Sequence, residues 1–352
     1  MIQLDRLPIP SSIVGAKFCY ALAILGGLTL TSARADGPVD VLPVSLSQGA
    51  VALHADWKFK YLPSTDLGGD KAFYQPSFDV SAWNSIPVPS HWELHGFAEP
   101  QYASEVKEGS GLYRRTFRIP ESWREHRVFM RFDGVLFGMT AYLNGKEIGT
   151  WESAFNPVTF DISDSLMPAD SENILAVHVT TRSKGWDFDT MDCWGLSGIY
   201  REVTLFALPP THLKDYTVRT TLGADGSARL GLEVVASAEA ALTARLSAPD
   251  GKVINESQIS LGTDGRGSTE VVLHQPRLWT AETPVLYGLE LDLQSGGKLL
   301  QRFMDRIGIR QVTIEKDIFK LNGTPIKLRG IDHHEIWPNV GRAATEELLR
   351  RD

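Results

Sequence analysis

The sequence predicts a mainly β protein, with two successive β-sandwiches followed by the start of a mixed α/β region. From Trp57 onward, short runs of alternating apolar and polar residues recur at intervals of roughly ten residues, with Gly, Asn and Asp between them. Few windows show the helical period of 3.6 residues. Because neither residue of Pro209-Pro210 can donate a hydrogen bond to a sheet, we expect the first sandwich to end there.

Residues 1–35 are predicted to form a cleavable signal peptide. Lys17 is followed by the apolar run Phe18–Leu30 and then by Ala33-Arg34-Ala35, which has the small residues of a cleavage site. The run is shorter than the roughly 20 residues that a membrane-spanning helix needs. We therefore expect cleavage after Ala35, a secreted or periplasmic protein, and no stable membrane anchor.

Residues 36–210 are expected to form the first sandwich. Asn144-Gly145 lies between two alternating runs and indicates a hairpin, because a type I′ turn needs positive φ at both central positions. The predicted strands include Val128–Asp133, Thr140–Leu143, Glu147–Trp151, Phe160–Ile162, Ile174–Thr180 and Ile199–Phe206.

Residues 211–312 are expected to form a second sandwich of the immunoglobulin-like class. A length of about 100 residues with about seven strands fits that class. Turns such as Asp225-Gly226 and Asp250-Gly251 separate the strands. The predicted strands are Leu213–Thr221, Ala228–Ala236, Leu242–Ser247, Lys252–Ile259, Thr269–Leu273, Tyr287–Leu293 and Leu299–Gly308.

Residues 313–352 are expected to begin a third domain. Asn322-Gly323 lies within the largely apolar run Ile318–Leu328 and predicts another hairpin. The stretch RGIDHHEIWPNVGR follows at Arg329–Arg342. Thr345 then has the features of a helix N-cap, because acidic residues follow it in the first turn. A strand, a loop and a helix in this order open a βα unit, and we expect the rest of the domain to lie beyond residue 352.

Charge and cysteine content argue against two classes of partner or site. The formal net charge is −8 and no basic tract is present, whereas binding to nucleic acid needs clustered Lys and Arg. Of the two cysteines, Cys19 lies in the predicted signal peptide, so Cys193 would remain alone. Neither a disulfide framework nor a cysteine-based zinc site is expected.

Four stretches carry a family resemblance. They read VPSHWELHGFAEPQY at Val88–Tyr102, GLYRRTFRIP at Gly111–Pro120, DCWGLSGIYREV at Asp192–Val203 and RGIDHHE at Arg329–Glu335. In this order they resemble glycoside hydrolase family 2, the family of β-galactosidase, β-glucuronidase and β-mannosidase, with the β-galactosidase branch the most similar. The resemblance implies a jelly-roll sugar-binding domain, an immunoglobulin-like sandwich and the truncated start of a catalytic (β/α)8 barrel.

The resemblance also implies the reaction of a retaining glycosidase. One carboxylic acid protonates the leaving oxygen and a second carboxylate attacks the anomeric carbon, with the two groups about 5–5.5 Å apart. In the family both glutamates lie on later barrel strands. No residue of this sequence is therefore assigned as catalytic, and the chain alone is expected to be inactive.

His334 is the main candidate for contact with substrate. The resemblance implies that it lies at the end of the first barrel strand and hydrogen-bonds the sugar, with His333 and Glu335 as further substrate-binding candidates. Barrel active sites lie at the C-terminal ends of the strands, and a neutral imidazole can donate to or accept from a hydroxyl. The alternative for each side chain is a structural role within the loop. Asp332 stands where the family commonly has Asn.

Asp192 is the candidate from the first domain. The resemblance implies that it reaches into the active site and binds sugar with sodium as a partner, and a carboxylate suits such a hard cation. The alternative is a loop aspartate that accepts backbone N–H groups. Beyond that, the cofactor expectation is open, with Na⁺ or Mg²⁺ as candidates for a complete enzyme. A calcium loop at DFDTMD, residues 187–192, lacks the expected Gly and distal Glu.

The expected partner is a β-galactoside or a related saccharide, with a β-glucuronide or β-mannoside as alternative substrates of the same family. A different class of function is a secreted carbohydrate-binding protein without catalysis, in which Trp92 or Trp194 would be exposed for stacking on sugar. A homo-oligomer formed through the β domains is a further open expectation.

Overall fold

The computed structural model describes residues 37–43, 49–102, 105–189 and 192–352. The predicted signal peptide over residues 1–35 lies outside the described residues. Within them, no helix is long and apolar enough to cross a membrane.

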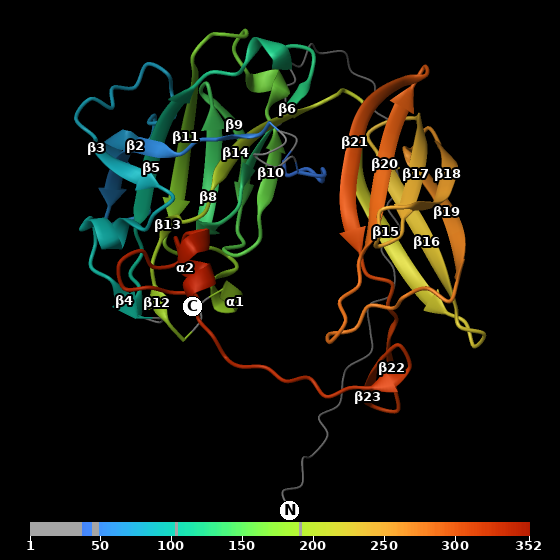
Figure 1. Ribbon diagram of the computed structural model, residues 1–352. Helices are drawn as coiled ribbons and strands as arrows, with labels where there is room; N and C mark the ends of the chain where they lie inside the picture. Colours follow the sequence, from blue (N-terminus) through green and yellow to red (C-terminus); the bar gives the residue numbers. More distant parts are fainter. Residues whose placement is uncertain (1–36, 44–48, 103–104, 190–191) are drawn as a thin grey trace, which may run out of the picture. The chain divides into compact units, whose positions relative to one another are not determined.

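The first domain is a sandwich of two antiparallel sheets (Figure 1). The four-stranded sheet has the order β1–β14–β6–β10, formed by Val51–Ala52, Val203–Leu208, Arg127–Phe132 and Val158–Asp161. The six-stranded sheet has the order β3–β2–β5–β11–β8–β9, formed by Asn84–Val88, Ala55–Leu62, Ser110–Phe117, Asn173–Thr180, Gly138–Leu143 and Lys146–Trp151.

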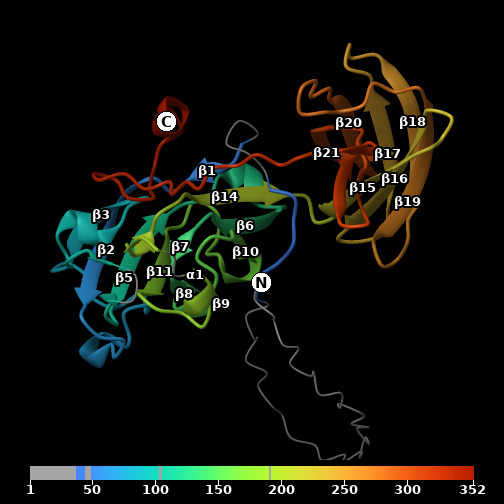
Figure 2. The same cartoon turned by 90° about the horizontal axis from the view of Figure 1, so that it is seen from below.

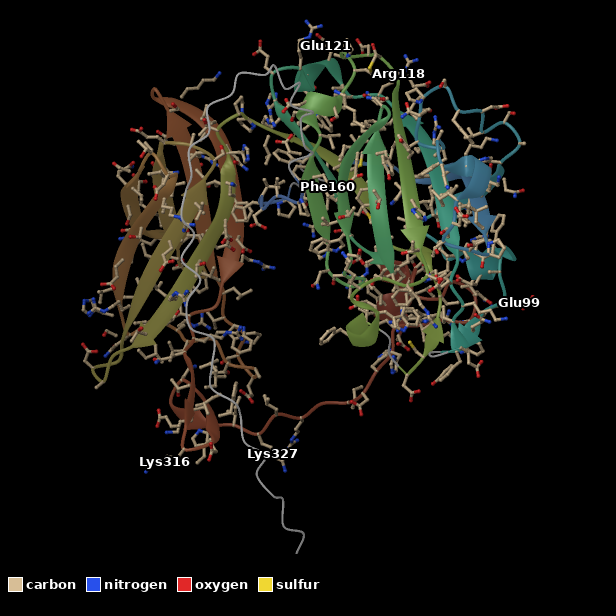
Figure 3. All side chains as sticks on the ribbon, turned by 180° about the vertical axis from the view of Figure 1, so that it is seen from behind. Glu99, Arg118, Glu121, Phe160, Lys316 and Lys327 are labelled. Atoms are coloured by element: carbon tan, nitrogen blue, oxygen red, sulfur yellow. The ribbon has the colours of Figure 1, made fainter. Side chains whose placement is uncertain are left out.

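Large aromatic side chains fill the space between these two sheets. Trp57 and Phe59 alternate along β2 and are fully buried, and Phe132 and Phe160 face them from the other sheet. Phe160 is labelled inside the sandwich in Figure 3. Replacing one such buried ring by alanine typically costs about 3–5 kcal/mol. This core makes the domain a rigid support for the loops at its ends.

Several connecting segments gather at one end of the first domain (Figure 1). Two short ribbons form there, β4 (Gln101–Tyr102) with β12 (Trp194–Gly195), and β7 (Val135–Leu136) with β13 (Gly198–Ile199). A short 3₁₀ turn at Trp92–His95 and the helix α1 (Trp186–Asp189) belong to the same connections. Glu99, labelled in Figure 3, lies at this end.

The second domain is the expected seven-stranded sandwich, with its two sheets packed face to face (Figure 2). The buried leucines of its core, including Leu232, Leu242 and Leu291, come from both sheets. One sheet has the order β15–β16–β19, formed by Leu213–Leu222, Ser227–Ala236 and Arg266–His274. The other has the order β18–β17–β20–β21, formed by Val253–Leu261, Ala240–Ser247, Tyr287–Ser295 and Lys298–Ile307.

The last segment contains a small sheet and a short helix. β22 (Val312–Glu315), β23 (Ile318–Leu321) and β24 (Thr324–Pro325) pair in sequence order, and α2 (Glu346–Arg351) follows. The predicted Asn322-Gly323 turn is confirmed, since both residues have positive φ, 53° and 79°. The predicted Thr345 cap is also confirmed, because its side chain accepts from the Leu348 N–H.

The strand expected just before the His333-His334 pair is not formed. Residues 326–336 have no strand assignment, and Leu328 and Ile331 are 71% and 88% exposed. A parallel strand needs neighbouring strands and helices that cover both of its faces. No described residues supply these, so the segment remains an extended connection.

Candidate functional site

The end of the first domain that carries β4 and β12 receives a loop from the C-terminal segment. The backbone N–H of Arg342 donates to His91 Nε2 at 3.0 Å, and Arg342 Nη2 donates to Cys193 Sγ at 2.8 Å. The Arg342 guanidinium also lies over the ring of Phe155, 5.2 Å from its centroid. We call Trp337–Arg342 the docked loop.

The docked loop is closed by its own hydrogen bonds. Trp337 and Gly341 exchange two backbone bonds, at 2.9 and 2.8 Å. Gly341 has a φ of +59°, and a Cβ there would lie 2.6 Å from both His91 Cδ2 and Leu196 Cδ1. Glycine is therefore required both by the backbone conformation and by the close approach to the first domain.

His91 is held in one orientation by the first domain. It is 1% exposed, its Nδ1 lies 3.2 Å from the Ser197 carbonyl oxygen, and its ring stacks on Tyr200 at 5.7 Å. Because Nε2 accepts from Arg342, the proton must be on Nδ1, which makes the imidazole neutral. Burial lowers the pKa of His91 to about 3, and the Arg342 charge acts in the same direction.

Glu93 lies on the other side of Ser197. Its Oε2 accepts the Ser197 N–H at 2.9 Å, and the residue is 7% exposed. Burial raises the pKa of Glu93 to about 7. His91 and Glu93 thus hold the carbonyl and the N–H of one serine, and a continuous polar path runs from Glu93 through Ser197 and His91 to Arg342.

The docked loop, the adjoining Ile336 and the first domain line an open pocket of about 400 Å³. That volume lies within the roughly 300–1,000 Å³ typical of small-molecule sites. Its walls are apolar, and Trp194, which is 49% exposed, offers an aromatic face. The lining residues are Leu94, Pro100, Trp194, Leu196, Ile336, Trp337 and Pro338.

Asp192 lies two residues before Trp194 and is fixed by Tyr102. The Tyr102 hydroxyl donates to Asp192 Oδ1 at 2.8 Å and to its carbonyl at 3.0 Å. Tyr102 and Trp194 are opposite each other in the β4–β12 ribbon, with their rings edge to face at 5.8 Å. The sequence did not identify Tyr102 as a partner, because a two-residue ribbon leaves no periodic signal.

The other candidates are exposed on the extended segment. His333 Nε2 lies 3.1 Å from Asp352 Oδ2. Among the described residues, the side chains of His334 and Glu335 make no hydrogen bond or ion pair. The structure thus brings the segments that carry Asp192 and His334 to one pocket, through Trp194 and Trp337, but it does not bring Asp192 and His334 into contact.

The described residues do not assemble a metal site around Asp192. No group of three or more His, Cys, Asp or Glu side chains with suitable placement occurs among them. One carboxylate oxygen already accepts from Tyr102, and a hard cation needs several oxygen ligands. Asp189 of the DFDTMD stretch accepts the Ala154 N–H at 2.8 Å, so it caps a loop instead of facing an ion.

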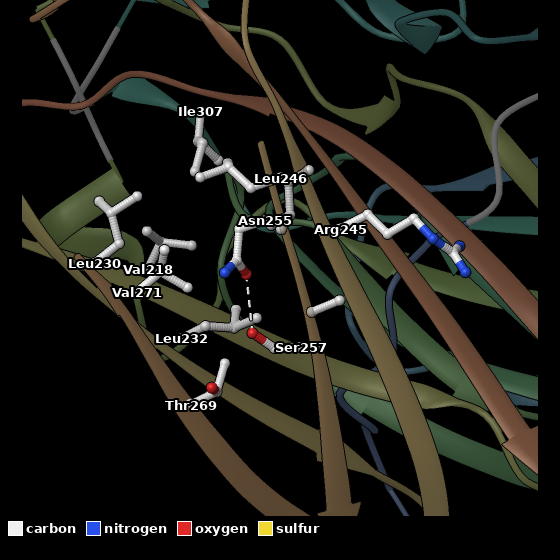
Figure 4. A pocket seen from close by; sticks show the side chains of 12 residues that line it. Val218, Leu230, Leu232, Arg245, Leu246, Asn255, Ser257, Thr269, Val271 and Ile307 are labelled. Atoms are coloured by element: carbon white, nitrogen blue, oxygen red, sulfur yellow. Dashed lines mark hydrogen bonds between the residues drawn. The ribbon is translucent and has the colours of Figure 1, made fainter. Parts of the chain in front are cut away.

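A cavity inside the second domain is too small to hold a sugar. It measures about 30 Å³ and lies between apolar side chains of the two sheets (Figure 4). Asn255 and Ser257 at its edge bond to each other, with Ser257 Oγ donating to Asn255 Oδ1 at 2.9 Å. The space suits about one water molecule. It is a packing feature of the sandwich.

Comparison with known families assigns both sandwiches. A family model described as "Glycosyl hydrolases family 2, sugar binding domain" matches residues 51–209. A second, described as "Glycosyl hydrolases family 2", matches residues 211–310. The chain belongs to glycosyl hydrolase family 2. The family models confirm the resemblance inferred from the four stretches, and the sheets of the structure confirm the mainly β fold class.

Individual family 2 relatives cover most of this chain. It is 33% identical over 326 residues to a β-galactosidase of Halalkalibacterium halodurans, covering 86% of this chain and 32% of the relative. It is 30% identical over 341 residues to a β-galactosidase of Priestia megaterium, with the same two coverages. The chain therefore spans about a third of the length of these relatives.

Solved family 2 structures share the fold. The β-glucuronidase of Bacteroides uniformis superposes with a TM-score of 0.73 and 28% identity, covering 86% of this chain and 37% of that one. The β-glucuronidase of Ruminococcus gnavus superposes with a TM-score of 0.69 and 27% identity, covering 86% of this chain and 52% of that one.

Proposed function

We propose that this chain is the N-terminal part of a retaining β-galactosidase, and that the whole protein hydrolyses terminal β-D-galactosides. The main support is the similarity to proteins named β-galactosidase, at 30–33% identity over 86% of the chain. The catalytic pair of glutamates belongs to barrel strands that follow residue 352 on this proposal. The chain's own part is to bind and orient the sugar.

Trp194, which lines the pocket, and Asp192, two residues before it in the sequence, support sugar binding. Trp194 presents an aromatic face on which the C–H face of a pyranose ring can pack. Asp192, held by Tyr102, offers a carboxylate that accepts from sugar hydroxyl groups. On this proposal His334 adds a donor or acceptor from the C-terminal segment.

A β-glucuronidase is the second candidate, because the similar solved structures carry that name. A glucuronide has a carboxylate that is best bound by Arg or Lys. Among the described residues, none of those lining the pocket is cationic, and the guanidinium of Arg342 is engaged with Cys193 and Phe155. These features favour a neutral sugar over a uronide.

The test compares this chain with a protein extended through the downstream coding sequence. The extended protein should hydrolyse nitrophenyl β-galactoside with a kcat/KM at least about tenfold above that for the glucuronide, a difference of about 1.4 kcal/mol. This chain alone should give no turnover. A reversed preference would establish the glucuronidase, and turnover by the chain alone would refute the placement of the glutamates.

Export is a separate part of the proposal. It is supported by the apolar run Phe18–Leu30 followed by the Ala33-Arg34-Ala35 site. N-terminal sequencing of the protein recovered from the periplasm or the medium should begin at Asp36. Retention of the intact N-terminus in the cytoplasm would contradict export without affecting the proposed activity.

A further inference from the structure

The contact between the docked loop and the first domain joins residues 251 positions apart, His91 and Arg342. Three kinds of interaction act on the same loop. They are the backbone hydrogen bond to His91, the Arg342 side chain against Cys193 and Phe155, and the close fit of Gly341 on Leu196. Three different interactions at one loop indicate a specific contact between the loop and the first domain.

The receiving surface is fixed without the loop. The His91 ring is oriented by the Ser197 carbonyl and by stacking on Tyr200, and the Ser197 N–H is in turn held by Glu93. Nε2 therefore presents an acceptor in a set direction. With the loop docked, the His91 ring is buried and Nε2 is closed off from water, so the Arg342 N–H is the donor that satisfies this buried acceptor.

The arriving loop is equally specific. Two backbone hydrogen bonds between Trp337 and Gly341 close the loop, and the next N–H, that of Arg342, donates to the imidazole of His91. Trp337 and Pro338 then form one wall of the pocket, opposite Trp194 and Leu196. Without the docked loop, the pocket would lose the residues of this wall.

We propose that His91 is a positioning residue of the sugar site, and that it anchors Trp337–Arg342 so that the pocket forms and the preceding His333–Glu335 segment is held at its rim. The role in sugar binding rests on the proposed function. His91 touches no sugar and acts through the Arg342 backbone.

Hydrogen exchange on this chain tests the anchor directly. The amides of Trp337, Gly341 and Arg342 should be protected in the wild type. In His91→Ala the protection of Arg342 should fall at least about tenfold, because its acceptor is lost. His91→Gln restores an acceptor near the Nε2 position and should keep protection within about threefold of the wild type.

Two further variants separate docking from general destabilisation. His212→Ala removes another buried imidazole, which lies just after the first domain, packs against its Phe129 and is bonded to the Pro209 carbonyl, and should leave the loop amides protected. Gly341→Ala blocks docking from the loop side and should reproduce the loss, with the β11 amides unaffected. Unchanged protection in His91→Ala, or an equal loss in His212→Ala, would overturn the anchor.

Kinetics of the extended protein test the link to substrate. His91→Ala should raise KM for the galactoside at least about tenfold with a smaller change in kcat, and His91→Gln should recover most of the loss. An unchanged KM in a variant whose loop is undocked would refute the positioning role. If the extended protein hydrolyses no glycoside, the proposed function fails, and the exchange data still decide whether His91 anchors the loop.

Discussion

Asp192 and Tyr102 illustrate what one residue can and cannot reveal in sequence. Asp192 was found through its place in a family-like stretch, and its alternative as a loop residue was left open. The structure shows its carboxylate bonded by a hydroxyl 90 positions away. That partner could not be predicted, because β4 and β12 have two residues each and no alternation that marks them as strands.

The Tyr102–Asp192 bond predicts a change in tyrosine titration. The hydrogen bond to Asp192 raises the pKa of Tyr102 above its usual value, because deprotonation would place two anions side by side. Asp192→Asn should lower that pKa, measured by NMR on ring-labelled tyrosine with Tyr102→Phe used for assignment. Asp189→Asn is the control and should leave the signal unchanged. A Tyr102 pKa that does not fall in Asp192→Asn would contradict the bond.

His91 and Glu93 should give opposite pH dependences of stability. The pKa of His91 is lowered to about 3. The contribution of this neutral imidazole to the free energy of unfolding is therefore complete above pH 6.5 and is lost as the pH falls below that value. The pKa of Glu93 is raised to about 7, so its contribution is complete below pH 4.5 and is lost as pH rises from there. Between pH 4.5 and 6.5 the two slopes, each about 1.4 kcal/mol per pH unit, largely cancel.

Removing one of the two groups should reveal the slope of the other. From pH 6.5 to 5.0, Glu93→Gln should lose roughly 2 kcal/mol more unfolding free energy than the wild type, because only the His91 term remains. His91→Gln should change in the opposite direction. Urea unfolding at the two pH values measures both. Parallel pH profiles for all three proteins would show that neither group is buried as the structure has it.

At the scale of elements, periodicity predicted the strands well because most strands have one buried face. In β16 the buried residues Leu230, Leu232 and Val234 alternate with less buried neighbours, and the seven strands of the second sandwich were all located in advance. The barrel strand was expected from the same reasoning, but a strand also needs partners. Sequence pattern shows that a run can pair, whereas pairing itself depends on the rest of the fold.

Replacement by alanine should have different effects on stability at two glycines that lie in strands. At Gly149 in β9 an added Cβ would lie 2.4 Å from the buried ring of Phe160, whereas at Gly231 in β16 nothing lies within 4 Å. Gly149→Ala should destabilise the first sandwich by about 1–3 kcal/mol through overpacking. Gly231→Ala should be neutral or slightly stabilising. Thermal unfolding of both variants checks the pair, and equal effects would refute the packing at Phe160.

At the scale of the whole molecule, the C-terminal segment contains an anchored part and an exposed part. The docked loop is anchored on the first domain, whereas Leu328 and Ile331 expose most of their surface. The sequence predicts only that residues 313–352 begin a third domain, and it does not indicate a contact between this segment and the first domain. The anchor was missed because His91, the acceptor, lies in a stretch whose only visible signal was family resemblance.

Exposure in the C-terminal segment predicts which apolar side chains can be replaced without loss of stability. Ile331→Asp should leave the melting temperature within about 1 °C and reduce light scattering at high concentration, because it removes uncovered apolar surface. Leu321→Asp is the contrasting variant. It places a charge at a site only 9% exposed and should cost more than about 2 kcal/mol. A large destabilisation by Ile331→Asp would mean that this side chain is packed in solution.

The Arg342–Cys193 contact gives the molecule a built-in chemical reporter. The thiol is half-buried, with the guanidinium 2.8 Å from Sγ. A fluorophore or spin label attached to Cys193 would occupy the space that the Arg342 side chain fills. Labelling of Cys193 and docking of the loop should therefore compete. The rate at which Cys193 reacts would then read out how often the first domain releases the loop, in a protein whose other cysteine lies in the predicted leader.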